Sequence, residues 1–452
     1  MNIEREWLAA LSLNLVDTYN YSTRRALDKI SDDYRITDQA IKSTINALII
    51  ETIRRKNIID RLANYILDTS FQQKQSPYPS LKSLDSKVKN LLRIMIYRLN
   101  FELHPAELVL NTVKLILNKN YSEYQLFFNI WLTSLSGFDP NTVILNSNDS
   151  IERLALETWE PYFLVKRFSE VYNQKAILIL EYFKTNSPNY IRLNNLKDKS
   201  VTFNEFKEYN VVLEQDKRMY DVYKVINSDV PVARLDGFKN GYFYIQSRSS
   251  AIISHLLNPQ KNEVILDSCA APGSKTTHIS SLTDNKCTII ALEVDKHRSE
   301  VLKKTLERCS VNNTTVLNAD ARDPSLIFEN LFDKILVDAP CSGSGTLSTK
   351  THAKWRIKNS LIKKYSQAQV AILNNISRYL KNDGFLLYST CSLLPEENEE
   401  VIEQFLNNNS NFEPVELPFP ELGEKINYNG KRLFPQDVDS EGFSIFYLKK
   451  IS

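Results

Sequence analysis

Hydrophobic positions recur with two different periods along the chain, and the change of period divides it. In the first third, apolar residues return every three to four positions, which is the spacing of one buried face of an α-helix. Residues 41–67, 88–101 and 106–117 follow this pattern and contain no Gly or Pro. These stretches predict an all-α region at the start of the chain.

From about residue 250, short apolar runs alternate with amphipathic segments. The candidate strands are residues 264–267, 288–293, 315–318, 334–337, 384–389 and 444–449. Alternating strands and helices predict an α/β fold of the Rossmann-like kind, with a doubly wound sheet. Such sheets bind ligands at the carboxyl ends of their strands.

The stretch between these regions is less regular. Residues 138–150 are polar, contain Pro140 and predict a linker. Residues 159–183 look helical, and residues 187–244 alternate short strands and helices. We therefore expect three domains: a helical domain at 1–145, a small α+β module at 150–250 and the doubly wound domain at 251–452.

Composition narrows the function classes. The net charge of the 452 residues is only +2, so an RNA partner would have to be bound through local basic patches. The five cysteines include no C-x-x-C pair, so we expect no metal site, and they suit a reducing cytoplasm. The N-terminus lacks the features of a signal peptide, and no run of about 18 apolar residues occurs.

Residues 264–279 read VILDSCAAPGSKTTHI, which predicts a strand, a loop of small residues and the start of a helix. Small residues let a ligand approach the backbone, and the helix start offers free N–H groups. A P-loop is excluded because Ser274 separates Gly273 from Lys275 and Ser268 replaces the first Gly. A dinucleotide site is excluded because the loop has one Gly. S-adenosylmethionine (SAM), with one sugar and no pyrophosphate, fits the loop.

Polar side chains end the neighbouring predicted strands. Glu293 ends the second strand, about 20 positions after the loop, where a carboxylate can bind a ribose diol. Asp320 follows the third strand and could accept a hydrogen bond from an adenine amino group, with Asp323 as a weaker candidate. Asp338 ends the fourth strand.

Two cysteines occupy equivalent places after the last two of these strands. Cys341 lies in DAPCSGSGT and Cys391 in YSTCSLLPEENEEV. Thiols at two adjacent strand ends argue for nucleophilic chemistry. Carbon 5 of a pyrimidine is a poor nucleophile, but a thiolate added to carbon 6 activates it toward the SAM methyl group. Asp338 is placed to act as the acid near the ring nitrogen.

Together these motifs resemble the Sun-type (Fmu-like, RsmB-like) RNA cytosine-5 methyltransferase family. The resemblance implies that Cys391 is the nucleophile and that Cys341 assists product release. It also implies an RNA substrate, most of all ribosomal RNA. The SAM contacts that it implies are Cys269, Ala270, Ala271, Pro272, Gly273, Ser274, Lys275, Glu293, Asp320 and Asp338. The helical start of the chain resembles the NusB-like RNA-binding domain of some members.

Some positions depart from the family pattern. Residues 128–135 lack the Arg of the usual basic helix, Ser247 replaces the usual Asp after Gln246, and no His follows Pro435. Three alternatives stay open: a tRNA methyltransferase of the same family, a SAM enzyme without a covalent step, and a catalytically idle RNA-binding or ribosome-assembly factor. We expect a monomer without membrane association.

Overall fold

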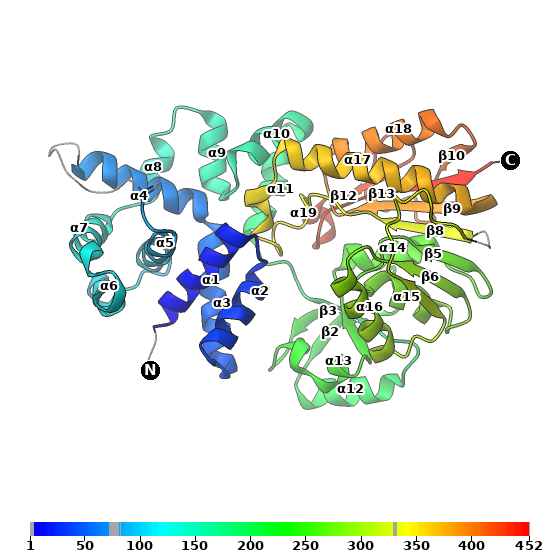
Figure 1. Ribbon diagram of the computed structural model, residues 1–452, viewed down its shortest axis with the longest axis horizontal. Helices are drawn as coiled ribbons and strands as arrows, with labels where there is room; N and C mark the ends of the chain where they lie inside the picture. Colours follow the sequence, from blue (N-terminus) through cyan, green and yellow to red (C-terminus); the bar gives the residue numbers. More distant parts are fainter. Residues whose placement is uncertain (1–3, 72–80, 82, 329–331, 452) are drawn as a thin grey trace. The chain divides into compact units, whose positions relative to one another are not determined.

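The computed structural model describes residues 4–71, 81, 83–328 and 332–451 (Figure 1). Its internal contacts divide the chain into two compact units. The first is Met1–Lys184 with Lys350–Arg356, and the second is Thr185–Thr349 with Ile357–Ser452.

The first unit is helical, as the 3.6-residue pattern predicts. Its helices are α1 (Arg5–Tyr19), α2 (Thr23–Asp33), α3 (Gln39–Arg54), α4 (Lys56–Phe71), α5 (Ser86–Asn100), α6 (Ala106–Asn120), α7 (Gln125–Leu135), α8 (Asn141–Leu145), α9 (Ser150–Thr158), α10 (Tyr162–Tyr172) and α11 (Lys175–Lys184). Asp38, Asp85 and Asp149 accept backbone N–H bonds at the starts of α3, α5 and α9. These caps satisfy donors that a helix start leaves unpaired.

The continuous pattern at residues 41–67 forms two helices instead of one. Helix α3 ends at Arg54 and α4 begins at Lys56. Tertiary contacts account for the break: Arg54 donates to the carbonyl of Lys184 at 2.8 Å, and the Arg55 guanidinium lies 4.1 Å from the ring centre of Trp159. Local periodicity does not contain these contacts.

The first unit extends beyond the predicted boundary near residue 150. The predicted linker contains α8, whose Val143 is buried. Asn57 of α4 donates to the carbonyls of Ala155 and Glu160, at 2.6 and 2.9 Å. Helices α9 to α11 therefore belong to the helical unit, although their sequence alone placed them in the α+β module.

A short segment from much later in the chain completes the helical unit. Lys354 is fully buried there, 2.9 Å from the carboxylate of the equally buried Glu160. Its ammonium also donates to the carbonyls of Arg54 and Trp159. The indole of Trp355 donates to the carbonyl of Ile53 at 2.8 Å. Within residues 350–356, Lys354 thus provides the positive charge that pairs with the buried Glu160 carboxylate.

The second unit begins with a small antiparallel sheet in the order β2-β3-β1-β4. Its strands are β1 (Tyr190–Leu193), β2 (Val212–Gln215), β3 (Val222–Asn227) and β4 (Phe243–Ile245), with helices α12 (Lys199–Glu208) and α13 (Asp236–Lys239). Ile191, Leu193, Phe206 and Phe243 form its buried core.

The rest of the second unit is a larger sheet, in the order β11-β12-β13-β9-β8-β5-β6-β7, with β10 paired to β13. The strands are β5 (Val264–Asp267), β6 (Thr288–Leu292), β7 (Thr314–Leu317), β8 (Phe332–Asp338), β9 (Leu380–Thr390), β10 (Phe412–Val415), β11 (Glu424–Lys425), β12 (Lys431–Leu433) and β13 (Phe443–Lys450). Strands β5 to β9 are parallel and β13 is antiparallel to β9. The predicted doubly wound sheet is confirmed.

Helices cover both faces of this sheet (Figure 1). They are α14 (Arg248–Leu257), α15 (Ser274–Leu282), α16 (Lys296–Arg308), α17 (Asn359–Ile376), α18 (Glu399–Asn408) and α19 (Pro435–Val438). Strand residues alternate between the faces: Ile265 packs in the cluster that contains α14, and Leu266 packs in the cluster that contains α17. Because β5 lies between β6 and β8, the order of the sheet reverses there, and this is where doubly wound folds bind ligands.

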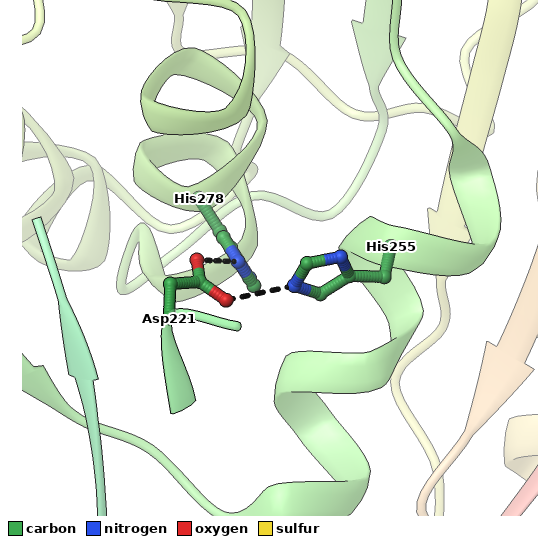
Figure 2. Close-up of side chains that lie close together, drawn as sticks. All are labelled: Asp221, His255 and His278. Carbon is green, nitrogen blue, oxygen red and sulfur yellow. Dashed lines mark hydrogen bonds and ion pairs between the residues drawn. The ribbon is translucent and has the colours of Figure 1, made fainter. Parts of the chain in front are cut away.

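A triad of two buried residues, Asp221 and His278, and the partly buried His255 joins the small sheet to the larger one. Asp221, just before β3, lies between His255 of α14 and His278 of α15, as Figure 2 shows. Each carboxylate oxygen is 2.9 Å from one imidazole Nε2. Burial, and then the nearby Arg192 guanidinium, lower the pKa of His278 to about 3, so its imidazole is neutral. Two Nε2–H donors then satisfy Asp221 and fix the small sheet against α15.

Among the described residues, no helix combines the length and the apolar composition needed to cross a bilayer.

Candidate active site

The small-residue loop lies between the carboxyl ends of three strands. The N–H of Ser268 donates to the carbonyl of Leu336 on β8, and the N–H of Ala270 donates to that of Leu292 on β6. Asp267, at the end of β5, is buried and accepts a hydrogen bond from Thr276 Oγ1 at 2.7 Å. Burial raises the pKa of Asp267 to about 6. The loop is therefore fixed by hydrogen bonds before any ligand arrives.

Gly273 is required where the loop enters α15. Its φ is +104°, in a region that side chains rarely adopt. A Cβ there would lie 2.9 Å from Leu302 Cδ1 of α16. The glycine thus lets α15 start close to α16, with its first N–H groups at the edge of the sheet.

Lys275 and Asp338 form an ion pair at this edge. Lys275 Nζ lies 2.7 Å from Asp338 Oδ2 and donates to Ser250 Oγ at 2.8 Å. The other carboxylate oxygen of Asp338 accepts a hydrogen bond from Ser389 Oγ at 2.9 Å. About a quarter of the Asp338 side chain is exposed. The carboxylate is therefore held in one orientation while it stays accessible.

Glu293 is held beside the loop. One of its oxygens accepts the N–H of Asp295 at 2.9 Å, and the other lies 3.2 Å from the Arg298 guanidinium. Arg298 also donates to the carbonyl of Ala271 at 2.6 Å. The predicted ribose carboxylate is thus linked to the predicted cofactor loop through one arginine.

Asp320 is hydrogen-bonded to Arg322, a partner that the sequence did not indicate. The guanidinium of Arg322 bonds both of its oxygens, with distances of 2.6 and 2.9 Å for the two closest pairs. This hydrogen bonding lowers the pKa of Asp320, so the carboxylate is ionised. An adenine amino group would have to share this carboxylate with Arg322.

The two cysteines at adjacent strand ends meet. Cys341 follows β8, Cys391 follows β9, and their Sγ atoms are 3.1 Å apart. This separation exceeds the ~2.05 Å of a disulfide, so both residues carry thiols. The hydrogen bond to Cys391, followed by burial, raises the pKa of Cys341. Burial raises the pKa of the loop cysteine, Cys269, to about 12, which keeps that thiol protonated.

Glu397 is a site residue that the sequence analysis missed. It is fully buried, and its carboxylate binds Ser342 and Ser392, which follow the two cysteines. In the sequence it stands in the acidic run PEENEEV, which looks like an ordinary helix start. The only available signal was its distance of six residues from Cys391.

The two cysteine turns are hydrogen-bonded to each other and to the loop before β13, which contains Gly442. The N–H of Gly345 donates to the carbonyl of Cys391 at 2.9 Å, and the N–H of Gly442 donates to that of Gly345 at 2.8 Å. A Cβ on Gly345 would lie 2.3 Å from the carbonyl oxygen of Gly442. Glycine is therefore needed for the three backbones to approach.

The structure thus gathers Lys275, Asp338, Cys341 and Cys391 at the ends of β5, β8 and β9. Glu293 and Asp320 lie at the ends of β6 and β7. The cofactor and catalytic roles of these residues stay predictions.

Comparison with known proteins gives consistent matches. A family model described as 16S rRNA methyltransferase RsmB/F matches residues 254–449. The probable ribosomal RNA small subunit methyltransferase B of Bacillus subtilis is 32% identical over 309 residues, which cover 67% of this chain and 69% of that protein. The ribosomal RNA small subunit methyltransferase B of Photorhabdus laumondii is 30% identical over 374 residues, 82% of this chain and 83% of that protein.

Solved structures share the fold. The crystal structure of PH0851 superposes with a TM-score of 0.82 at 24% identity and covers all of both chains. NSun6 from Pyrococcus horikoshii, solved with SFG, has a TM-score of 0.59 at 22% identity and covers 65% of this chain and 98% of that one.

Proposed function

The chain belongs to the 16S rRNA methyltransferase RsmB/F family, and from this premise we propose that it methylates carbon 5 of a cytosine in RNA. SAM is the methyl donor of the family. We take ribosomal RNA as the first candidate substrate, since the relatives are ribosomal RNA methyltransferases by name.

The observation that carries the proposal is the 3.1 Å separation of the Cys341 and Cys391 sulfurs. A single reactive thiol would suffice for addition to carbon 6. The reaction must also remove the proton from carbon 5 and expel the first sulfur, and a second thiol within contact distance can serve that stage. Two thiols at one place match a reaction with these two stages.

The order of the stages follows from the charge on sulfur. In the proposal, the Cys391 thiol gives its proton to solvent, its thiolate bonds carbon 6, and the electron pair moves toward carbon 5. Carbon 5 would then take the methyl group of SAM, which leaves as S-adenosylhomocysteine. The contact with Cys391 raises the pKa of Cys341 in the free enzyme, so Cys341 holds its proton there. Once Cys391 is bonded to carbon its charge is gone, and Cys341 can give its proton to solvent more easily. The Cys341 thiolate then takes the carbon 5 proton, the electron pair of that bond re-forms the double bond between carbons 5 and 6, and Cys391 leaves as the thiolate.

Asp338 serves the addition step in this proposal. A proton at the ring nitrogen stabilises the charge that the thiolate brings to the base. Asp338 is held for this role by the Lys275 ammonium, 2.7 Å away, and by the Ser389 hydroxyl, and about a quarter of its side chain is exposed. The loop 269–275, Glu293 and Asp320 would bind SAM.

The helical unit and the small sheet would provide RNA affinity and target choice. The target cytosine must leave its stack to reach both thiols, as for other enzymes that act on bases. A tRNA substrate would use the same chemistry. An idle assembly factor would retain the fold without needing the two thiols or the ion-paired Asp338.

The test is methyl transfer from SAM to a 16S rRNA transcript by the purified chain, with bisulfite mapping of the product. We expect cytosine-specific methylation that Cys391→Ala abolishes without loss of SAM binding. Cys287→Ala is the matched control. Cys287 is a buried thiol directly before β6, at the opposite end of that strand from Glu293, and it accepts a hydrogen bond from the Thr283 hydroxyl. Full activity of Cys391→Ala would reject the covalent step. Activity on tRNA transcripts alone would favour the tRNA alternative.

A further inference from the structure

One buried carboxylate connects the two turns that carry the cysteines. Glu397 Oε1 accepts the backbone N–H of Ser342 at 2.8 Å, and Glu397 Oε2 accepts Ser392 Oγ at 2.6 Å. Ser342 directly follows Cys341, and Ser392 directly follows Cys391. Each cysteine is therefore one residue away from an anchor on the same side chain.

The connection is closed to water. Glu397 and Ser392 are fully buried, and Ser342 is 7% exposed. Ser344 Oγ lies 3.0 Å from Ser392 Oγ and adds a further link between the turns. The backbone of Glu397 is itself held, since Tyr388 on β9 donates its hydroxyl to the Glu397 carbonyl at 2.6 Å.

We propose that Glu397 is a positioning residue that sets the distance between the Cys341 and Cys391 sulfurs. The inference rests on the proposed function and assigns Glu397 no contact with substrate. Its carboxylate joins the ends of β8 and β9 at a point beyond the last pair of the parallel ladder, Asp338↔Ser389. Past that pair the ladder ends, and the turns are held by the backbone bond from the Gly345 N–H to the Cys391 carbonyl together with side-chain bonds, among which those of Glu397 reach both turns.

The role requires a carboxylate at this position. Its two oxygens accept from the two turns at once, and a buried charge-assisted hydrogen bond is stronger than a neutral one. Removal of the side chain would leave the Ser342 N–H and the Ser392 hydroxyl buried without their acceptor, which favours separation of the turns. A shift of about 1 Å at a reacting group is enough to cost a large part of a rate.

A change at Glu397 should affect both the addition to carbon 6 and the removal of the carbon 5 proton. Cys391 must reach carbon 6, and Cys341 must then reach the carbon 5 proton of the same base. A change in the separation of the turns displaces one thiol relative to the other and slows the addition, the release or both. SAM binding should not respond, because the cofactor loop is held by β6 and β8 backbone atoms.

The distance between the sulfurs can be measured without RNA. Diamide oxidises two nearby thiols to a disulfide: each thiol gives up its hydrogen, the S–S bond forms, and the N=N bond of diamide is reduced to a hydrazine. In the wild-type full chain we expect rapid formation of the Cys341–Cys391 disulfide, identified by peptide mass mapping. Glu397→Ala should slow it at least about tenfold, and Glu397→Gln, which keeps the shape, should slow it less.

The same variants should lose methyl transfer in the same order, with kcat reduced and the SAM Kd unchanged. Glu400→Ala is the control, because Glu400 belongs to the same acidic run but is exposed on α18. If Glu397→Ala does not fold, Glu397→Gln carries the test by itself. Disulfide formation at the wild-type rate in the folded variants would overturn the inference. Loss of the covalent mechanism alone would not, because the disulfide rate is independent of it.

Discussion

Cys341 Sγ lies 3.1 Å from Cys391 Sγ, although 50 residues separate the two cysteines in sequence. The parallel pairing of β8 and β9 brings them together, because it aligns Asp338 with Ser389 and both strands end there. In the proposed reaction, one bound base would contact both sulfurs.

The first prediction separates the roles of the two thiols. Cys341→Ala should still form the bond between Cys391 and carbon 6 but should fail to remove the carbon 5 proton. An RNA–protein adduct should then accumulate and survive denaturing electrophoresis. The adduct should be absent in the Cys341→Ala, Cys391→Ala double variant. An adduct that needs Cys341 and persists without Cys391 would mean that the roles are exchanged.

The second prediction concerns SAM binding. Glu293→Ala and Asp320→Ala should each weaken SAM binding about tenfold or more, since a hydrogen bond to a charged group contributes on the order of 1.5–3 kcal/mol. Arg322→Ala is the informative partner, because Arg322 bonds both oxygens of Asp320. It should leave SAM affinity unchanged or raise it, because it frees the carboxylate. Calorimetry that finds wild-type affinity in both acidic variants would remove these residues from the cofactor site.

The third prediction concerns the pH dependence of stability at Asp267. Burial raises its pKa from 3.8 to about 6 in the folded chain. Between these values the folded state binds more protons than the unfolded state, so this carboxyl lowers stability as the pH rises through the window. The shift of about two pKa units corresponds to up to about 3 kcal/mol.

Asp267→Asn should remove that dependence while its amide oxygen still accepts from Thr276. Urea unfolding of both proteins at about pH 4 and at pH 7 measures it. We expect the wild type to lose stability relative to the variant at the higher pH. A difference in stability that stays constant with pH would show that Asp267 titrates normally.

The sequence predicts the larger sheet well because its strands are buried on both faces. Such strands appear as short continuous apolar runs with polar ends. The run at 334–337 lies within β8 (Phe332–Asp338), and the run at 384–389 lies within β9 (Leu380–Thr390). The polar residues that follow these runs are the ones that lie together at the carboxyl edge of the sheet, and they include both cysteines.

Contacts between distant residues could not be predicted in the same way. Nothing near Asp221 indicates that its partners are His255 and His278, because α14 and α15 bring them there. The helix break at Arg55 depends on Trp159 in the same manner. Glu397 could not be picked out from the other acids of PEENEEV, because its burial depends on the contact with Ser342 in the turn after β8.

The burial of Lys354 in the helical unit has a consequence for the order of synthesis. The helices leave the ribosome before residues 350–356 do, and the counter-charge of Glu160 is made more than 190 residues after it. Until then Glu160 lacks its buried partner, and the loss of one member of a buried ion pair typically costs about 3–5 kcal/mol.

A fragment of residues 1–184 should therefore be markedly less stable than the same helices in the full chain. A synthetic peptide of residues 350–356 should restore stability when added in trans, and Lys354→Met in the peptide should prevent this. The helical unit is thus completed only after much of the second unit has been made.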